Sequence, residues 1–270
     1  MALISTPNRL HRWQYRPGSF LLAEGDSWFC YPGEKNGILS PYDIIMDVAD
    51  HYDVYSFAHF GDTIATMASD TNLKTIKNRL SYVLHGPSTS KLIKAFLISG
   101  GGNDLFDTGN PNNYLAKIIK MKSSNDPLAY IDEDELSKCM RTLEKYYNKF
   151  ISTTRKFLNP NIKYALHTYD YAIPDNTPYE GIVKTGPWLW PVLSKKNVHN
   201  TAIGQKIIMH IVDTFYEMLT RVTSAQPNTF IIDLRNTLQD KSLWENEIHP
   251  SRKGFEVIGD VYYKALKDNL

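Results

Sequence analysis

The sequence predicts one α/β domain, a three-layer doubly wound sandwich with a mostly parallel, five-stranded sheet. Along the 270 residues, short apolar segments alternate with amphipathic helical patterns, and this order is typical of a sheet covered by helices on both faces. A chain of this length with 42% hydrophobic residues can bury a sizeable core. Because no repeat, low-complexity tract or linker interrupts it, we expect a single domain over residues 1–270.

Each predicted strand is a short apolar segment that ends in polar or glycine-rich residues. Segments such as Ala-Phe-Leu-Ile-Ser at 95–99 are apolar at consecutive positions, which is typical of strands buried on both faces of a parallel sheet. The five predicted strands cover residues 20–24, 54–58, 95–99, 163–168 and 229–234.

Three long helices are predicted from apolar residues that recur at spacings of three and four. The clearest covers 134–157, where Leu136, Met140 and Leu143 share one face and Asp132 supplies capping chemistry before the helix. The other two helices are expected over 202–222 and 253–267.

Two segments depart from this alternation, and each follows a predicted strand. Residues 106–131 are rich in Asn, Pro and Ser, and residues 171–198 carry four prolines together with Trp188 and Trp190. In open α/β sheets, ligands bind beyond the carboxyl ends of the strands. We therefore expect these insertions to form a pocket wall or lid.

Composition excludes several classes of partner. The formal net charge is +1, with 30 Lys and Arg against 29 Asp and Glu, so no overall field attracts nucleic acid or an anionic membrane. The apolar segments are far shorter than the roughly 20 residues that span a bilayer. The oligomeric state is not indicated by the sequence.

The first twenty residues and the cysteines favour a cytoplasmic protein. Polar residues interrupt residues 1–20, where an export signal would need a continuous apolar stretch. Cys30 and Cys139 show neither a disulfide framework nor a metal-binding spacing. Pairing in an oxidising compartment, or a mature secreted form, is the alternative.

A serine follows the first predicted strand, in the segment Glu-Gly-Asp-Ser-Trp at 24–28. We expect a tight strand-to-helix crossing that presents the Ser27 hydroxyl at the carboxyl edge of the sheet, a position suited to a nucleophile. An isolated Gly-Asp-Ser is more often only a turn or a helix cap. Other residues must therefore support the catalytic interpretation.

A histidine near the other end of the chain could act as the base that such a serine needs. His249 precedes Pro250 in a constrained loop just before the last predicted helix. General-base assistance is typically worth about 10²–10⁴ in rate. A lone histidine is more often structural, and sequence position does not show that Ser27 and His249 meet.

Two further residues could stabilise the oxyanion that forms during acyl transfer. Gly61 follows the second strand and is expected to begin a helix, with its N–H pointing into the site. Asn103 follows the glycines after the third strand, where its side-chain amide can donate. A glycine-rich turn could also bind phosphate, but neither a Gly-x-Gly-x-x-Gly nor a Gly-Lys-Ser/Thr motif is present.

Taken in order, Gly-Asp-Ser at 25–27, Gly61, Gly-Gly-Asn-Asp at 101–104 and His-Pro at 249–250 resemble the SGNH/GDSL hydrolase superfamily. The resemblance spans the chain from Ser27 to His249. It implies a flavodoxin-like sheet of order 2-1-3-4-5. It also implies esterase, lipase, thioesterase or carbohydrate-deacylase activity on a small-molecule, carbohydrate or lipid ester.

The resemblance implies a role for each of these residues. Ser27 would be the nucleophile and first oxyanion donor through its own N–H, and Gly61 and Asn103 would complete the oxyanion hole. His249 would be the general base, and no metal or organic cofactor would be needed. His59 and His167 fall near strand ends but fit no metal-ligand spacing, which favours structural roles.

The sequence departs from the family pattern three residues before the histidine, where Asn246 replaces the expected aspartate. An asparagine can orient the imidazole but cannot stabilise imidazolium with a full charge. Three outcomes follow: a dyad assisted by Asn246, an acid supplied by Glu245, Glu247 or Asp233, or an enzyme with little activity. We expect Asn246 itself behind His249. The alternative from another class is a non-catalytic binding module that keeps the fold.

Overall fold

The computed structural model describes residues 20–35, 38–39, 41–83, 93–106, 114–180 and 186–270. Its main feature is a five-stranded sheet in which every neighbouring pair is parallel. The strands lie in the order β4 (Asp53–Ser56), β1 (Phe20–Gly25), β5 (Ile93–Ser99), β6 (Lys163–His167) and β7 (Thr229–Ile232). This is the order 2-1-3-4-5, so the predicted α/β fold class is confirmed. A small antiparallel ribbon joins β2 (Glu34–Lys35) and β3 (Ile38–Leu39).

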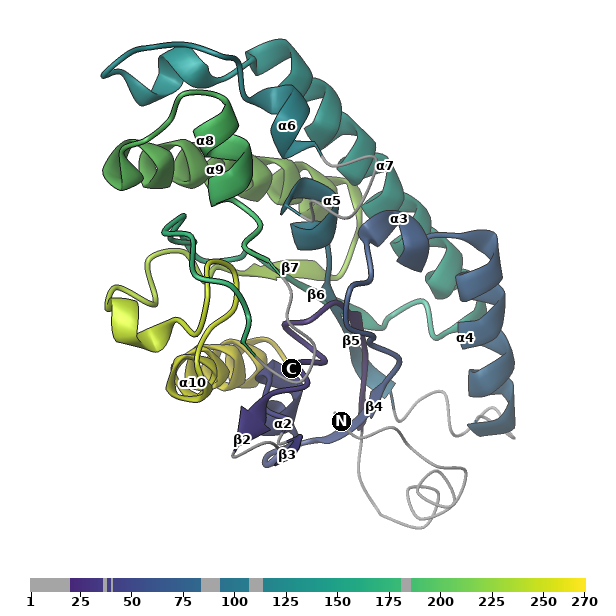
Figure 1. The fold of residues 1–270 in the computed structure, drawn as a ribbon. Helices are drawn as coiled ribbons and strands as arrows, with labels where there is room; N and C mark the ends of the chain where they lie inside the picture. Colours follow the sequence, from purple (N-terminus) through teal and green to yellow (C-terminus); the bar gives the residue numbers. More distant parts are fainter. Residues whose placement is uncertain (1–19, 36–37, 40, 84–92, 107–113, 181–185) are drawn as a thin grey trace.

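Helices cover both faces of the sheet, as Figure 1 shows. On one face α2 (Ile44–Ala49) packs against α10 (Arg252–Asn269), and on the other α7 (Glu133–Phe157) packs against α9 (Thr201–Ala225). The shorter helices are α3 (Ile64–Met67), α4 (Asp70–Val83), α5 (Gly102–Phe106), α6 (Leu115–Ile118), η2 (Pro127–Tyr130), α8 (Trp190–Lys195) and η3 (Lys241–Leu243).

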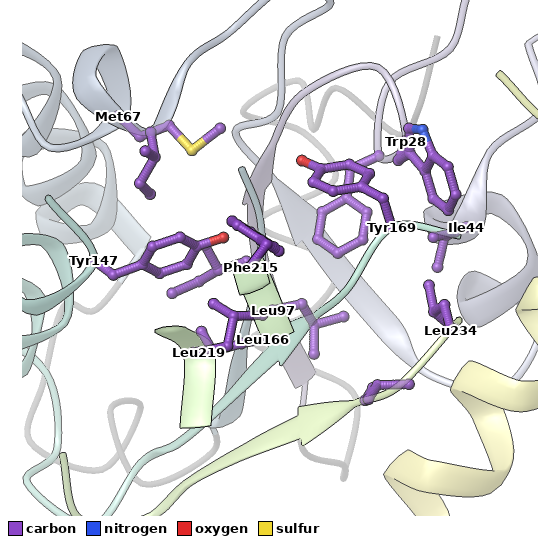
Figure 2. Close-up of a cluster of buried hydrophobic side chains, with 14 of the residues drawn as sticks. Trp28, Ile44, Met67, Leu97, Tyr147, Leu166, Tyr169, Phe215, Leu219 and Leu234 are labelled. Atoms are coloured by element: carbon purple, nitrogen blue, oxygen red, sulfur yellow. The ribbon is translucent and has the colours of Figure 1, made fainter. Parts of the chain in front are cut away.

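The core forms because the central strands are apolar on both faces. All six residues of β1 are buried, and burying each aliphatic side chain contributes about 1.5–3 kcal/mol. Figure 2 shows Leu97 and Leu166 of β5 and β6 close to Tyr147 of α7 and Phe215 of α9. The helices thus cover the apolar strands, as a parallel sheet requires.

Helix ends follow local capping chemistry. The Asp132 carboxylate accepts the Glu135 N–H at 3.2 Å, which starts α7 one residue before the predicted position. Arg155 and Lys156 lie in the last turn of α7, where positive charge complements the helix dipole. In α10 the Ser251 hydroxyl accepts the Gly254 N–H at 3.2 Å. This cap places the loop that carries His249 directly before a rigid helix.

Two local expectations were wrong. No helix directly follows Ser27, because residues 26–30 form a turn and bend, and α2 begins only at Ile44. Gly61 does not begin a helix either: Thr63 caps α3 by accepting the Thr66 N–H, so Gly61 stays in the preceding turn with φ +86°. After β1, the Asp26 side chain bonds to the Trp28 N–H and favours a turn over a helix. After β4, the Thr63 cap sets the start of α3 three residues beyond Gly61.

The fold brings the predicted site residues to one edge of the sheet. Ser27 follows β1, Gly61 follows β4 and Asn103 follows β5, while His249 lies in the loop between β7 and α10. The chain changes direction across the sheet between β1 and β5, and open α/β sheets bind ligands at such a switch point.

Candidate active site

Asp26 holds the turn that presents Ser27. Its Oδ1 accepts the Trp28 N–H at 3.0 Å and the Ser99 hydroxyl at 2.7 Å, and its other oxygen accepts the Tyr169 hydroxyl. The carboxyl group is buried, and this burial raises the pKa of Asp26 to about 6 although the hydrogen bonds oppose the shift. A buried, fully bonded network of this kind restricts the turn to one geometry.

Ser27 and His249 meet although 222 positions separate them. The Ser27 Oγ lies 2.8 Å from the His249 Nε2, and both residues are buried, with 4% and 2% of their surfaces exposed. The loop before α10 closes on itself, since the His249 carbonyl accepts the Glu245 N–H at 2.9 Å. The distance is that of a nucleophile and a base in hydrogen-bond contact.

Asn246 stands behind His249 and determines its tautomer. The Asn246 Oδ1 lies 3.0 Å from the His249 Nδ1, and it also accepts the backbone N–H groups of Ile248 at 3.1 Å and His249 at 3.0 Å. Backbone N–H groups can only donate, so the atom they contact must be the amide oxygen. The His249 Nδ1 therefore carries a proton, which leaves the Nε2 lone pair directed at Ser27.

Burial keeps the His249 ring neutral. Desolvation lowers the pKa of His249 to about 3. Three aromatic rings surround it, with centroid distances of 4.6 Å to Tyr31, 5.3 Å to Trp188 and 6.0 Å to Phe60. Because Asn246 brings no negative charge to favour the imidazolium, nothing in this shell offsets the desolvation.

Two of the other candidate acids, Glu245 and Asp233, form hydrogen bonds with residues other than His249 through their carboxylates. Glu245 Oε2 accepts the Tyr42 hydroxyl at 2.5 Å. Asp233 binds Arg235, with 2.8 Å between Oδ2 and the guanidinium Nη2. Among the described residues, the hydrogen bonds of the His249 ring go to Ser27 and Asn246 and to neither of these carboxylates. The geometry therefore favours Asn246 as the residue that orients the imidazole.

Glu247, the third candidate acid, holds the second insertion in place. Its two carboxylate oxygens accept four backbone N–H groups, from Asn176 at 3.0 Å, Trp188 at 2.6 Å, Leu189 at 2.7 Å and Trp190 at 3.0 Å. Burial raises the pKa of Glu247, while these hydrogen bonds favour its charged form. Nothing in the sequence around Glu247 signals this role, because its partners lie 57 to 71 positions away.

Asn103, in α5, and Gly61, on the turn after β4, lie on neighbouring segments that are bonded to each other. The Asn103 Nδ2 donates to the Asp62 carbonyl at 2.9 Å, and Asp104 Oδ2 accepts the Ile64 N–H at 2.8 Å. An amide nitrogen has two hydrogens, so the second can serve another acceptor. These bonds fix the Gly61 turn against α5.

A small cavity of about 20 Å³ opens beside the Ser27 side chain. The residues that line it include Ser27, Asn103, Phe106, Tyr169, Ala172 and Ile248. Gly61 does not line this cavity. The structure thus brings Ser27, His249, Asn246 and Asn103 to one site, whereas Gly61 lies on the adjoining turn.

The tryptophans near the site pack rather than project into solvent. Trp28 is 3% exposed and its Nε1 donates to the Ile248 carbonyl at 3.1 Å. Trp188 is buried with its ring edge-on to His249. The described part of residues 171–198 therefore covers the histidine. Of the first insertion, residues 107–113 lie outside the described residues, and η2 packs on α9.

The other histidines near strand ends differ in surroundings. His167 is buried, and burial lowers its pKa to about 4; its ring stacks on Trp28 at 5.9 Å. His59 is exposed and lies near Asp62. In the described part of the chain, one group of three residues, Glu24, His59 and Asp62, could hold a metal ion.

None of the helices in the described residues is both long enough and apolar enough to cross a membrane. Residues 1–19, on which the expectation about an export signal depends, lie outside the described part. The cytoplasmic location stays a prediction.

No model of a protein family and no curated protein matches this sequence. Solved structures do match. A Streptococcus pneumonia protein described as a "putative platelet activating factor" aligns with a TM-score of 0.52 at 10% identity, over 96% of this chain and 90% of that chain.

Two further matches have TM-scores just below one half. A carbohydrate esterase family 3 protein from Talaromyces cellulolyticus aligns at 0.49 with 12% identity, over 93% of this chain and 97% of that chain. A member of the lipolytic protein G-D-S-L family from Veillonella parvula DSM 2008 aligns at 0.47 with 13% identity over the same shares. At these identities the likeness concerns the fold alone.

Proposed function

We propose that this chain, whose fold is that of the SGNH/GDSL hydrolases, is a serine esterase that cleaves its substrate through an acyl-enzyme. The observation that carries the proposal is the continuous contact from Ser27 Oγ to His249 Nε2, and from His249 Nδ1 to Asn246 Oδ1. This contact supports the proposal that Ser27 is the nucleophile, His249 the base and Asn246 the residue that orients the base.

In the acylation step, Ser27 Oγ attacks the ester carbonyl carbon while its proton passes to His249 Nε2. The carbonyl oxygen becomes an oxyanion, for which the Ser27 N–H, the Gly61 N–H and the free hydrogen of the Asn103 amide are the proposed donors. When the tetrahedral intermediate collapses, the carbon–oxygen bond to the alcohol breaks. The alcohol leaves with the proton from His249 Nε2.

In the deacylation step, water takes the place of the alcohol and His249 Nε2 accepts its proton. The acyl group leaves as a carboxylic acid and Ser27 regains its hydrogen. Asn246 holds the ring in the tautomer that both steps need, but it adds no charge to stabilise imidazolium. We therefore expect a slower enzyme than one with aspartate at this position.

The small cavity indicates a short acyl group. The space beside Ser27 that the centre of a water-sized group can occupy is about 20 Å³, and the pocket is partly open to solvent. The part next to Ser27 therefore has room for about one water molecule or methyl group. Phe106, Ala172 and Ile248 supply apolar wall next to Ser27. We propose that acetyl esters fit here and longer acyl chains do not. We also propose that residues 1–270 form one domain and that the insertion at 171–198 forms the pocket wall.

A panel of p-nitrophenyl esters tests this function. We expect kcat/KM to be highest for the acetate and to fall for the butyrate and octanoate, because the longer chains exceed the cavity. Acetylated sugars tested in parallel report on the alcohol side. A preference for octanoate would contradict the cavity argument. No turnover of any ester by folded protein would favour the non-catalytic binding module instead.

Substituting Asn246 tests the residue behind the histidine. Asn246→Asp should preserve or raise kcat, because a carboxylate stabilises imidazolium. Asn246→Ala should lower kcat by about 10- to 100-fold. This loss is smaller than the roughly 10⁴-fold loss in kcat when a triad aspartate is replaced. The measurement is kcat across pH on p-nitrophenyl acetate.

The pH profile gives an independent readout of the same residue. Because burial lowers the pKa of His249 to about 3, the base stays unprotonated as pH falls, and wild-type kcat/KM should hold constant from about pH 8 to about pH 5. In Asn246→Asp the new charge should raise the pKa of His249 by about 1 to 3 pH units and move the acid limb upward.

Glu245→Gln is the matched control for these variants, since the Glu245 carboxylate accepts the Tyr42 hydroxyl and Glu245 bonds to His249 only through its backbone N–H, which the substitution keeps. Glu247→Gln is unsuitable, because it also disturbs four backbone hydrogen bonds. If Glu245→Gln abolished turnover while Asn246→Ala had no effect, a neighbouring acid would be the supporting residue and the assignment of Asn246 would be wrong.

A further inference from the structure

A buried carboxyl group lies three residues before Ser27 without a hydrogen bond. Glu24, the fifth residue of β1, is 0% exposed, and neither of its carboxylate oxygens has a hydrogen-bond partner. Burial and the charge of Asp62 raise the pKa of Glu24 well above its usual range. The Asn72 side chain and the Gly25 N–H lie near enough to favour the charged form, but neither donor reaches the carboxylate with hydrogen-bond geometry. Buried polar atoms in native proteins normally have a partner, so Glu24 needs an explanation.

Two more metal-binding side chains lie beside Glu24, on the turn after β4. His59 Nδ1 and Asp62 Oδ2 are 3.5 Å apart, and one ligand atom from each of Glu24, His59 and Asp62 lies within 4.8 Å of the others. The His59 N–H donates to the Gly25 carbonyl at 2.9 Å, which ties the turn to β1. The His59 side chain is 64% exposed, so an ion can reach the group from solvent.

We propose that Glu24, His59 and Asp62 bind one divalent transition cation of the zinc class. Zinc bonds to nitrogen and oxygen ligands are about 2.0–2.2 Å long, which sets neighbouring ligand atoms about 3.4 Å apart in a tetrahedron. The 3.5 Å between His59 and Asp62 already has this length. An imidazole ligand favours zinc over calcium and magnesium, which prefer oxygen ligands.

A cation accounts for all three residues, whereas simpler explanations account for fewer. A surface His–Asp pair at positions i and i+3 explains His59 and Asp62 but leaves Glu24 without a partner. Protonation of Glu24 removes its charge but still leaves two buried oxygens without hydrogen bonds. The guanidinium of Arg79 on α4 acts on Glu24 as a favourable charge, yet burial outweighs its effect.

The position of the group suggests what the cation does. Gly61 lies between the ligands His59 and Asp62, and the Asp62 carbonyl accepts the Asn103 amide. A cation held here joins β1 to the Gly61 turn and so braces the turn whose Phe60 ring stacks on His249. The site stands on Glu24, His59 and Asp62 alone and does not depend on esterase activity.

Calorimetric titration of chelator-treated full-length protein with ZnCl₂ tests the proposal. We expect one zinc per chain, a higher Tm with zinc, and a Co²⁺ complex with visible absorption bands. Glu24→Gln and Asp62→Asn should each weaken zinc binding by at least about tenfold, because each removes one anionic ligand. Asp62 is only partly buried, so its variant stays informative if Glu24→Gln folds poorly.

His210→Gln is the matched control, because His210 also pairs with a carboxylate, Glu133, at 3.1 Å, while no third metal-binding side chain lies beside this pair in the described part of the chain. Its zinc affinity should equal that of the wild type. Absence of stoichiometric zinc binding, or equal affinity in wild type and folded Glu24→Gln, would overturn the proposal. Ester turnover is measured separately. The zinc-binding result can therefore be interpreted even if the protein hydrolyses no ester.

Discussion

Ser27→Ala is expected to lower kcat for ester hydrolysis by about 10⁴–10⁶-fold, since loss of a serine nucleophile costs about 10⁶ where a full triad is present. Because Asn246 adds no charge to stabilise imidazolium, we expect a slower wild type, and this expectation sets the lower end of the range. The residual rate should come from the oxyanion donors and substrate binding, which the substitution leaves in place. Steady-state kinetics on p-nitrophenyl acetate measure the loss.

An organophosphonate ester probe locates the nucleophile directly. Peptide mass spectrometry should find the label on Ser27 and find none in Ser27→Ala. Ser152→Ala is the control, because Ser152 lies on α7 and its hydroxyl donates to the Lys149 carbonyl of the same helix. A label on another residue, or undiminished turnover by Ser27→Ala, would mean that Ser27 is not the nucleophile.

Asn103→Ala is expected to lower kcat by about 10²–10³-fold, the usual effect of removing one oxyanion donor. The side chain lines the cavity beside Ser27 and one of its amide hydrogens is bonded to the Asp62 carbonyl. The kinetic signature is a fall in kcat with little change in KM, because the lost interaction forms in the transition state.

Thermal unfolding must accompany this measurement, because the variant also loses the hydrogen bond to Asp62. Asn148→Ala serves as the control: Asn148 accepts a hydrogen bond from Gln226, between α7 and α9. It should change the Tm without lowering kcat. A loss confined to KM in Asn103→Ala would make Asn103 a ground-state substrate contact instead.

The secondary structure could be predicted from the sequence because its causes are local. The apolar run in β5 and the spacing of Leu136, Met140 and Leu143 in α7 depend only on neighbouring residues. The strands and the three predicted helices lie within a few residues of their predicted bounds, whereas α4 was not predicted. The order of strands and polar segments also placed Ser27, Gly61 and Asn103 at one edge, since carboxyl ends of parallel strands lie together.

Only the tertiary structure decided the contacts between residues distant in sequence. The tautomer of His249 depends on which way the Asn246 amide faces, and two backbone N–H groups determine that. Glu247, which looked like a candidate acid, instead bonds to backbone in the second insertion. The direction of a hydrogen bond depends on packed three-dimensional geometry, which residue spacing does not encode.

Contacts between distant residues also explain why the sequence alone did not predict the proposed metal site. His59 has no metal-ligand spacing within its own segment, so the sequence alone favoured a structural histidine. Glu24 joins His59 and Asp62 only because β1 and β4 are neighbours in the sheet. The sequence by itself determined the fold and the nucleophile–base candidates through local patterns. Pairing of strands distant in the chain decided that the buried Glu24 lies beside His59 and Asp62.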